Sequence, residues 1–313
     1  MKTVRIILCV LLPIVLLLAP AYLRKQAQSD FFDSVRHKEP QPAYGTVTLY
    51  HIVSARTYSG SLTKWLQFCA ERYEKKHKGT HIEVEGMTEE TYRERVAYGR
   101  LPDGYSFFSG MLDRESLQPV GLTSENLREG LFDADYAVPY CVTGYAAIRT
   151  EQADVPLPEA NATAALMCLE AEGTVCDWRS IGDRLRDESF GALYTAEPVG
   201  NFTDAVCWLG VASAASEQTA LALREFFAYI LDEAQQRTLG QLGAIPARND
   251  VAAEYAAPLL KELAAAYETV QTVDPFLLAA QRDALRSDAE AAYAGDAEAE
   301  RRFRDRMMQI LWK

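Results

Sequence analysis

The sequence predicts an α/β protein that is long enough for two domains. Residues 46–53 form a β-branched run, an amphipathic helix begins near Leu62, and residues 80–85 alternate apolar and polar side chains, so the first folded segment is a βαβ unit. The chain has 313 residues, of which 49% are apolar and 24% are charged, as in an ordinary globular protein with a substantial core. We therefore expect a parallel sheet with helices packed on it.

The predicted elements before residue 110 follow one another closely. The helix after Ser61 repeats apolar side chains at helical spacing, and Gly79 ends it after a Lys/His-rich turn. Residues 89–99 predict a short helix, and residues 101–108 predict a turn and then a buried strand. The apolar face of the first helix consists of Leu62, Trp65, Leu66, Cys69 and Tyr73.

A second helical region begins at Ser216, a residue type that accepts hydrogen bonds from the first turn of a helix. Asp232 is expected to cap the next helix, with Gln235 as its capping-box partner. Gly243 is expected to end that helix, and Ile245-Pro246 prevents any continuation. The apolar face of the first of these helices consists of Leu223, Phe226, Phe227, Ile230 and Leu231.

The first 43 residues predict export from the cytoplasm. Lys2 and Arg5 precede a long apolar run, as in a signal peptide. The run is also nearly long enough to span a bilayer, so residues 1–23 are either a cleaved signal peptide or a membrane anchor, and we favour the anchor. Cys9 lies inside the apolar run, which argues against lipid attachment. Residues 24–43 are polar and are expected to be a linker.

Charge and motifs exclude several classes of function. The formal net charge of −12 argues against binding to nucleic acid. Ser61 and Lys64 match a Ser-x-x-Lys pattern without its companion motifs, so Ser61 is better explained as a helix-start residue. The six cysteines include no Cys-x-x-Cys pair, and most are expected to be small buried residues, although Cys168 and Cys176 could bridge if their segment folds back. We expect no catalytic residue, no cofactor and no metal.

Three separated blocks of sequence carry a family resemblance. The first runs from Phe68 to Gly79 and resembles the pattern F.K.YEKKH.G, with Arg72 in place of the Lys. The second, residues 135–148, contains a Val-Pro-Tyr strand followed by Gly-Tyr-Ala-Ala-Ile. The third, residues 233–250, has Glu-Ala-Gln followed by spaced Leu, Gly, Pro, Arg and Asp. These blocks resemble the extracellular solute-binding proteins of bacterial ABC importers, chiefly the sugar-binding family 1, and residues 284–311 resemble the closing helices of that family.

The resemblance implies a two-lobe periplasmic-binding-protein-like fold with a ligand cleft between the lobes, preceded by an N-terminal hydrophobic helix. One lobe would comprise residues 44–140 and 207–255, and the other residues 141–206 and 256–313. The second lobe is expected to be shortened, because the short stretch before Asn201 lacks the Thr-Trp pair of the family. The implied function is capture of a small solute, a carbohydrate, by a monomer at the outer face of the cytoplasmic membrane, for an ABC permease.

Ligand-binding residues are expected at the carboxyl ends of the strands, where open α/β sheets bind their ligands. Arg56 and Tyr58 follow the first strand, and Ser109 follows the third. By the resemblance, Asn201 and Asp204 face the cleft, although a plain turn explains them equally well. Aromatic faces suit sugar rings, but core packing is the commoner role of every aromatic candidate except Tyr58. The predicted ligand-binding residues are Arg56, Tyr58, Ser109, Tyr140, Asn201 and Asp204.

Other functions stay open at this point. A membrane-anchored sensor or accessory protein with the same fold and no transport role would suit the shortened lobe and the anchor. An anion- or iron-binding member of the fold is suggested by Arg56, which lies near a predicted helix N-terminus. An extracellular enzyme would need a nucleophile–base pair that the sequence does not offer.

Overall fold

The computed structural model describes residues 44–53, 57–123, 126–131, 135–150, 175–178, 194–198, 201–277, 279–293 and 295–310. All of them belong to one compact unit, Tyr44–Lys313. The predicted signal peptide or anchor, residues 1–23, and the predicted linker, residues 24–43, lie outside them. Within the described ranges, no helix combines the length and the apolar character needed to cross a bilayer.

The larger sheet has seven strands in the order β2-β1-β3-β9-β5-β10, with the short strand β4 also paired to β9. Strand β1 runs parallel to β2 and β3, whereas β9 runs antiparallel to both β3 and β5. The strands are β1 (Gly45–Val53), β2 (Thr80–Thr88), β3 (Gly104–Phe108), β4 (Leu117–Gln118), β5 (Val138–Val142), β9 (Val206–Ala212) and β10 (Ile245–Pro246). The predicted βαβ unit is therefore confirmed at residues 45–88.

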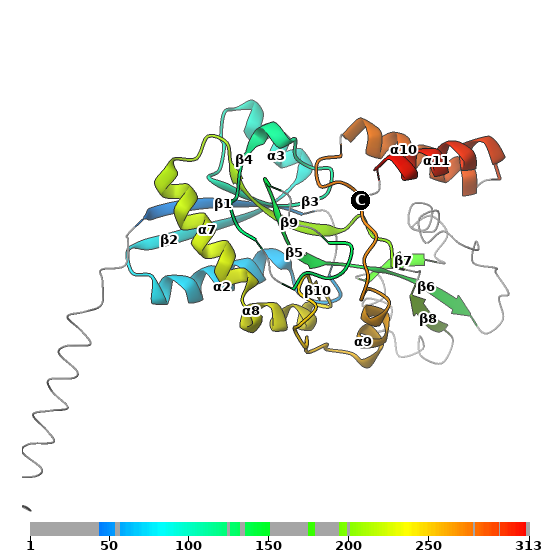
Figure 1. Ribbon diagram of the computed structural model, residues 1–313, viewed down its shortest axis with the longest axis horizontal. Coiled ribbons are helices and arrows are strands. Elements are labelled where there is room, and N and C mark those ends of the chain that lie inside the picture. The colour runs from blue at the N-terminus through cyan, green and yellow to red at the C-terminus, as the bar shows by residue number, and fades with distance from the viewer. Residues whose placement is uncertain are drawn as a thin grey trace, which may run out of the picture. The chain divides into compact units, whose positions relative to one another are not determined.

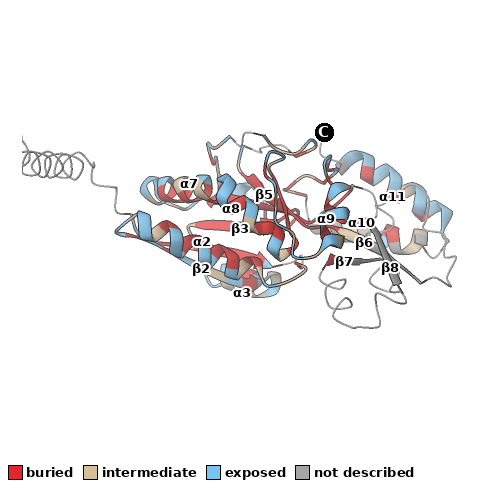
Figure 2. Cartoon of the chain, turned by 90° about the horizontal axis from the view of Figure 1, so that it is seen from below, coloured by how far each residue is buried: buried red, intermediate tan, exposed pale blue. Residues whose placement is uncertain are grey.

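Helices cover both faces of this sheet (Figure 1). Helices α2 (Leu62–Lys76) and α7 (Glu217–Leu231) bury their predicted apolar faces in one core. Helix α3 (Glu89–Ala97) buries Tyr92 in a second core on the other face. Figure 2 shows the buried residues gathered on the strands and on the inner sides of the helices. The alternating faces of β1 supply both cores, because Leu49 joins the first and Ile52 the second.

The helix ends test the predicted capping residues. Ser216 accepts a hydrogen bond from the backbone N–H of Thr219, as expected of an N-cap. The capping box at Asp232 was a wrong prediction: Asp232 occupies the N-cap position of α8 (Glu233–Thr238), but its side chain makes no capping hydrogen bond. Gln235 is buried instead of reaching back over the helix start. Gly243 follows the short helix η2 (Leu239–Leu242) with φ +80°, so its left-handed conformation is confirmed.

A smaller antiparallel sheet has the strand order β7-β6-β8. Its strands are β6 (Tyr145–Thr150), β7 (Val175–Asp177) and β8 (Tyr194–Pro198). Only two residues separate the end of β5 from the start of β6, and the chain returns from β8 to β9, so two short connections join the sheets. The end of the second sequence block, residues 145–148, lies in β6, which we call the crossing strand because it begins the small sheet.

The C-terminal helices form an antiparallel pair fastened by a carboxylate. Helix α9 (Pro258–Ala265) precedes α10 (Ala279–Tyr293) and α11 (Ala297–Ile310). Asp288 of α10 bonds Arg302 at 3.0 Å and Arg306 at 2.6 Å on α11. Burial opposes ionisation of Asp288, but the two guanidinium groups outweigh it and hold the pKa of the carboxyl below its usual value. Helices are present within residues 284–311 as expected, as α10 and α11.

A buried histidine connects the central strands. The Nδ1 atom of His51 lies 2.8 Å from the hydroxyl of Ser106, which in turn lies 3.0 Å from the hydroxyl of Tyr140. Burial lowers the pKa of His51 to about 4, although contact with Ser106 opposes the shift. The imidazole is therefore neutral at pH 7, so its Nδ1 atom can accept the Ser106 proton.

This depressed pKa predicts a loss of stability in mild acid. In the unfolded chain His51 binds a proton near pH 6.5, whereas in the folded chain it binds one only near pH 4. Stability should therefore fall as the pH drops below 6.5, by about 2 kcal/mol between pH 7 and pH 5. Urea unfolding at both pH values measures the difference. The His51→Asn variant, which keeps an acceptor near Ser106, should lose that part of the pH dependence.

The matched control is His81→Asn, because the His81 side chain is largely exposed. This control should show the same pH dependence as the natural chain. An unchanged pH dependence in His51→Asn would refute the assignment of the effect to the buried imidazole.

Candidate functional site

The candidate site lies at the edge where the parallel strands of the large sheet end. Strands β1, β2, β3 and β5 all present their carboxyl ends there, and the antiparallel strand β9 begins at the same edge. Open α/β sheets bind their ligands outside this edge, because the loops that follow the strands converge there. Both connections to the small sheet also leave from it.

The loop after β3 is fixed by hydrogen bonds from its neighbours. Trp208 donates its indole N–H to the hydroxyl of Ser109 at 3.0 Å, and the backbone N–H of Ser109 donates to Val206. The next residue, Gly110, has φ +81° and donates its N–H to the carbonyl of Pro275. The predicted residue Ser109 therefore lies at the expected edge, where its buried hydroxyl orients Trp208.

The loop after β1 is described only in part. Arg56 lies outside the described residues, so its predicted role stays a prediction. Tyr58 is partly buried, and its Cβ atom lies against the position where Gly243 would carry a side chain. Ser59 donates its backbone N–H to Leu242 at 3.2 Å. The loop after β1 is thus attached to the turn that ends η2, and Tyr58 packs beside the second core.

The two connections between the sheets are packed around Gly144. A Cβ atom on Gly144 would lie 2.7 Å from the ring of Trp178 and 2.8 Å from the ring of Tyr267. These two rings meet edge to face with centroids 6.0 Å apart. The hydroxyl of Tyr267 accepts a hydrogen bond from the backbone N–H of Tyr145 at 3.1 Å, and burial raises its pKa.

Asn201 and Asp204 lie on the return connection. The hydroxyl of Tyr145 donates to a carboxylate oxygen of Asp204 at 2.8 Å, which ties the outward connection to the return connection. Asn201 accepts the backbone N–H of Gln271 through its carbonyl. Thr203 donates its hydroxyl to the carbonyl of Thr143 at 2.8 Å. The structure therefore places Asn201 and Asp204 on one short segment that faces the crossing strand.

Tyr140 lies inside the molecule rather than at the edge. Its ring is fully buried and stacks on Trp65 with centroids 5.9 Å apart and planes 2° apart. Its hydroxyl contacts Ser106 and the thiol of Cys207. Within this structure Tyr140 has no exposed surface to offer to a ligand, and it supports strand β5 from the core.

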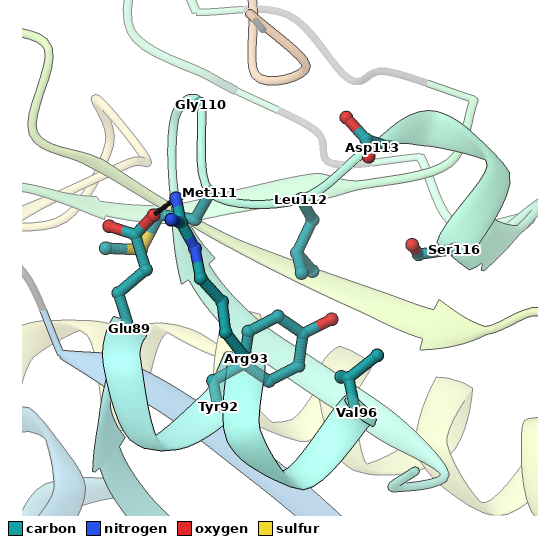
Figure 3. A pocket seen from close by; sticks show the side chains of 9 residues that line it. All are labelled: Glu89, Tyr92, Arg93, Val96, Gly110, Met111, Leu112, Asp113 and Ser116. Atoms are coloured by element: carbon teal, nitrogen blue, oxygen red, sulfur yellow. Dashed lines mark hydrogen bonds and ion pairs between the residues drawn. The ribbon is translucent and has the colours of Figure 1, made fainter. Parts of the chain in front are cut away.

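A pocket of about 280 Å³ opens beside the loop after β3 (Figure 3). Helix α3 contributes Glu89, Tyr92 and Arg93, and the loop contributes Met111 and Asp113. Glu89 and Arg93 form an ion pair at 2.6 Å on one turn of the helix. Burial raises the pKa of Tyr92, whose ring meets Tyr105 edge to face. A second hollow of about 320 Å³ shares Tyr92 and Asp113 with the first.

The sequence did not single out this pocket. Residues of α3 and of the loop after β3 are separated by strand β3, and only the sheet brings them together. One signal was present: α3 begins directly after β2, so its first turn had to lie at the carboxyl edge. Among the residues that the structure describes, no cluster of His, Cys, Asp and Glu could hold a metal ion.

Comparison with known proteins identifies the fold. No protein-family model matches the sequence, and no curated protein matches it. Among solved structures, a chitin oligosaccharide binding protein aligns with a TM-score of 0.54 and 14% identity, over 84% of this chain and 97% of the other. The GacH receptor of Streptomyces glaucescens, described unliganded and in complex with acarbose, has a TM-score of 0.55 and 14% identity, over 85% and 97%.

A third structure, CpMnBP1 with mannobiose bound, has a TM-score of 0.57 and 9% identity, over 85% of this chain and 99% of the other. Likeness at these identities establishes the architecture alone. Membership of family 1 and a shortened second lobe stay predictions. The chain has the two-lobe α/β fold of periplasmic-binding-protein-like proteins.

The packing at Gly144 yields a prediction. The Gly144→Ala variant should be destabilised by about 1–3 kcal/mol, because the added methyl group collides with two rings that the surrounding core holds in place. Thermal or urea unfolding measures the loss. The Trp178→Phe change removes the indole atoms that the methyl group would meet, so the double variant should be less destabilised than the sum of the single changes. Strict additivity would show that the collision is not the cause.

Proposed function

We propose that this protein captures a small carbohydrate outside the cytoplasm and delivers it to an ABC-type importer. The observation that carries the proposal is the pocket at the carboxyl edge of the large sheet, in a chain with the two-lobe binding-protein fold. The three solved relatives are described with chitin oligosaccharide, acarbose and mannobiose. Those names support a saccharide as the class of ligand here.

The chemistry of the pocket suits a saccharide. Sugar rings pack their C–H faces on aromatic or apolar side chains, while their hydroxyls need donors and acceptors placed around them. Tyr92 and Met111 supply apolar surface, and Glu89, Arg93 and Asp113 supply charged hydrogen-bonding groups. Charged groups form stronger hydrogen bonds to hydroxyls than neutral groups do. The second hollow, which shares Tyr92 and Asp113, leaves room for a ligand longer than one ring.

Capture would use both lobes. We assign residues 44–140 and 207–255 to one lobe and residues 141–206 and 256–313 to the other, so that the connections at Thr143–Gly144 and at residues 201–205 act as the hinge. Arg56, Tyr58, Asn201 and Asp204 would complete the site from the loops and the hinge, while Ser109 and Tyr140 support it from within. The protein binds and releases its ligand without making or breaking a bond, and the closed form docks on a membrane permease as a monomer.

A thermal-shift screen of the full chain tests this function. The probes are oligosaccharides of the chitin, maltose and mannose types, with amino acids and inorganic phosphate as competing classes. A ligand that binds only the folded state raises the melting temperature with its concentration, since stability increases by RT ln(1 + [L]/Kd). A concentration-dependent rise with one saccharide class is expected. A response to phosphate alone, or to no probe, would refute the carbohydrate function.

Variants locate the ligand once a saccharide responds. Asp113→Asn should weaken binding about tenfold or more, because a hydrogen bond to a charged group contributes about 1.5–3 kcal/mol. Asp305→Asn, on the exposed side of α11, is the matched control and should bind normally. Asn201→Ala and Tyr58→Ala should also weaken binding without unfolding the protein. Unchanged affinity in Asp113→Asn would remove the pocket from the site.

A further inference from the structure

Two cysteines face each other at the foot of the hinge. Cys141 of β5 and Cys207 of β9 are direct partners in the antiparallel register of the large sheet. Both are fully buried and both are free thiols in this structure. The register shifts between Pro139 and Cys141, so Tyr140 and Cys141 both lie close to Cys207.

The distance between the two strands suits a covalent bond. Directly opposed residues of antiparallel strands have Cα atoms about 4.5–5.5 Å apart. Disulfides need a Cα separation of about 4.4–6.8 Å. The register of β5 and β9 places Cys141 directly opposite Cys207, so their Cα atoms fall within that range. The thiol of Cys207 also donates to the hydroxyl of Tyr140 at 3.1 Å, so the sulfur atoms lie in one small polar cluster within the core.

The Cys141–Cys207 pair lies at the base of both connections that form the proposed hinge. Cys141 lies next to the last residue of β5, just before the chain crosses to the small sheet. Cys207 is the second residue of β9, just after the chain returns. All three strands of the small sheet lie between the two cysteines in the sequence. A bond between them would close that whole segment into a loop and fasten both connections at their base.

We propose that Cys141 and Cys207 form a disulfide when the chain folds in an oxidising compartment. The compartment follows from the proposed extracytoplasmic function, but the pairing itself follows from the register of β5 and β9. In the reaction, one thiolate attacks a disulfide oxidant such as glutathione disulfide and releases one glutathione thiolate. The second cysteine thiolate then attacks the mixed disulfide and releases the other. Two cysteine thiols lose two protons and two electrons, and one oxidant disulfide becomes two thiols.

The bond must form before the sheet closes. Reaction needs an accessible thiolate, whereas both sulfurs are fully buried in the folded chain and burial raises the pKa of Cys141. The surrounding hydrogen bonds tolerate the change, since the Tyr140 hydroxyl keeps its contact with Ser106 when the Cys207 proton is lost. The crosslink restricts the unfolded chain most, so the oxidised protein should be the more stable form.

Refolding of the full chain tests the proposal. The reduced, denatured protein is refolded in glutathione buffer, then unfolded, alkylated, digested and analysed by mass spectrometry. We expect a crosslinked peptide that joins Cys141 to Cys207, an alkylated Cys69, and a higher melting temperature than in the reduced protein. Tryptophan fluorescence checks that the refolded protein has reached the native state. Alkylation of both Cys141 and Cys207 in protein that has refolded under glutathione disulfide would overturn the proposal, as would their pairing with other cysteines.

Matched variants separate this pair from the remaining thiols. Cys69→Ser should keep the crosslink and the gain in melting temperature, because Cys69 lies on α2 and is not part of the register pair. The Cys141→Ser variant should lose both the crosslink and the gain in melting temperature, and its Cys207 should be alkylated. The readout is a peptide mass, which does not depend on any ligand. A failed saccharide screen with the crosslink present would therefore reject the proposed function alone, and the reverse result would reject only the disulfide.

Discussion

The packing around Gly144 is the constraint on which the arrangement of the two sheets depends. The chain leaves the large sheet, enters the small one and later returns, and each connection is only a few residues long. Close approach of the Trp178 and Tyr267 rings requires a residue without a side chain at this position. The hydroxyl of Tyr267 accepts a hydrogen bond from the backbone N–H of Tyr145 on the crossing strand. The carboxylate of Asp204 accepts a second hydrogen bond, from the hydroxyl of Tyr145. Both connections are thus ordered by contacts that a few side chains supply.

This ordering explains why the candidate site lies where it does. The loops after the parallel strands and the first turn of α3 converge at one edge, and the connections between the sheets leave from that same edge. The core behind the edge contains His51, Ser106 and Tyr140 in one chain of contacts. That chain links β1, β3 and β5 through side-chain contacts.

Local patterns in the sequence predicted much of the large sheet. Helix α2 and strand β2 could be predicted because their apolar residues repeat with the period of a helix and of a strand. The role of Gly243 could be predicted because the left-handed conformation that ends a helix favours glycine. The capping box at Asp232 failed because the Gln235 side chain is buried and does not reach back to the helix start. Propensity describes a helix end in isolation and contains no information about its neighbours.

The candidate site was less predictable for two physical reasons. Tyr140 lies beside a register shift in β5. One extra residue in a strand changes which face of the sheet a side chain occupies, so the alternation of residues in the sequence could not predict on which face the Tyr140 ring lies. The pocket combines Tyr92 with Asp113, which meet only because β3 inserts between β1 and β9. Topology of this kind is a property of the whole sheet. The positions of Asn201 and Asp204 on the return connection came from the family resemblance, not from any local pattern.

Hydrogen exchange of the full chain tests capture between the lobes most directly. Exchange is measured by mass spectrometry with and without the saccharide that raises the melting temperature, because bound segments open less often and exchange more slowly. The account predicts slower exchange both in residues 108–116, after β3, and in residues 201–205, on the return connection. Protection confined to α3 and the loop after β3 would show that the ligand occupies one lobe alone, and capture between the lobes would be wrong.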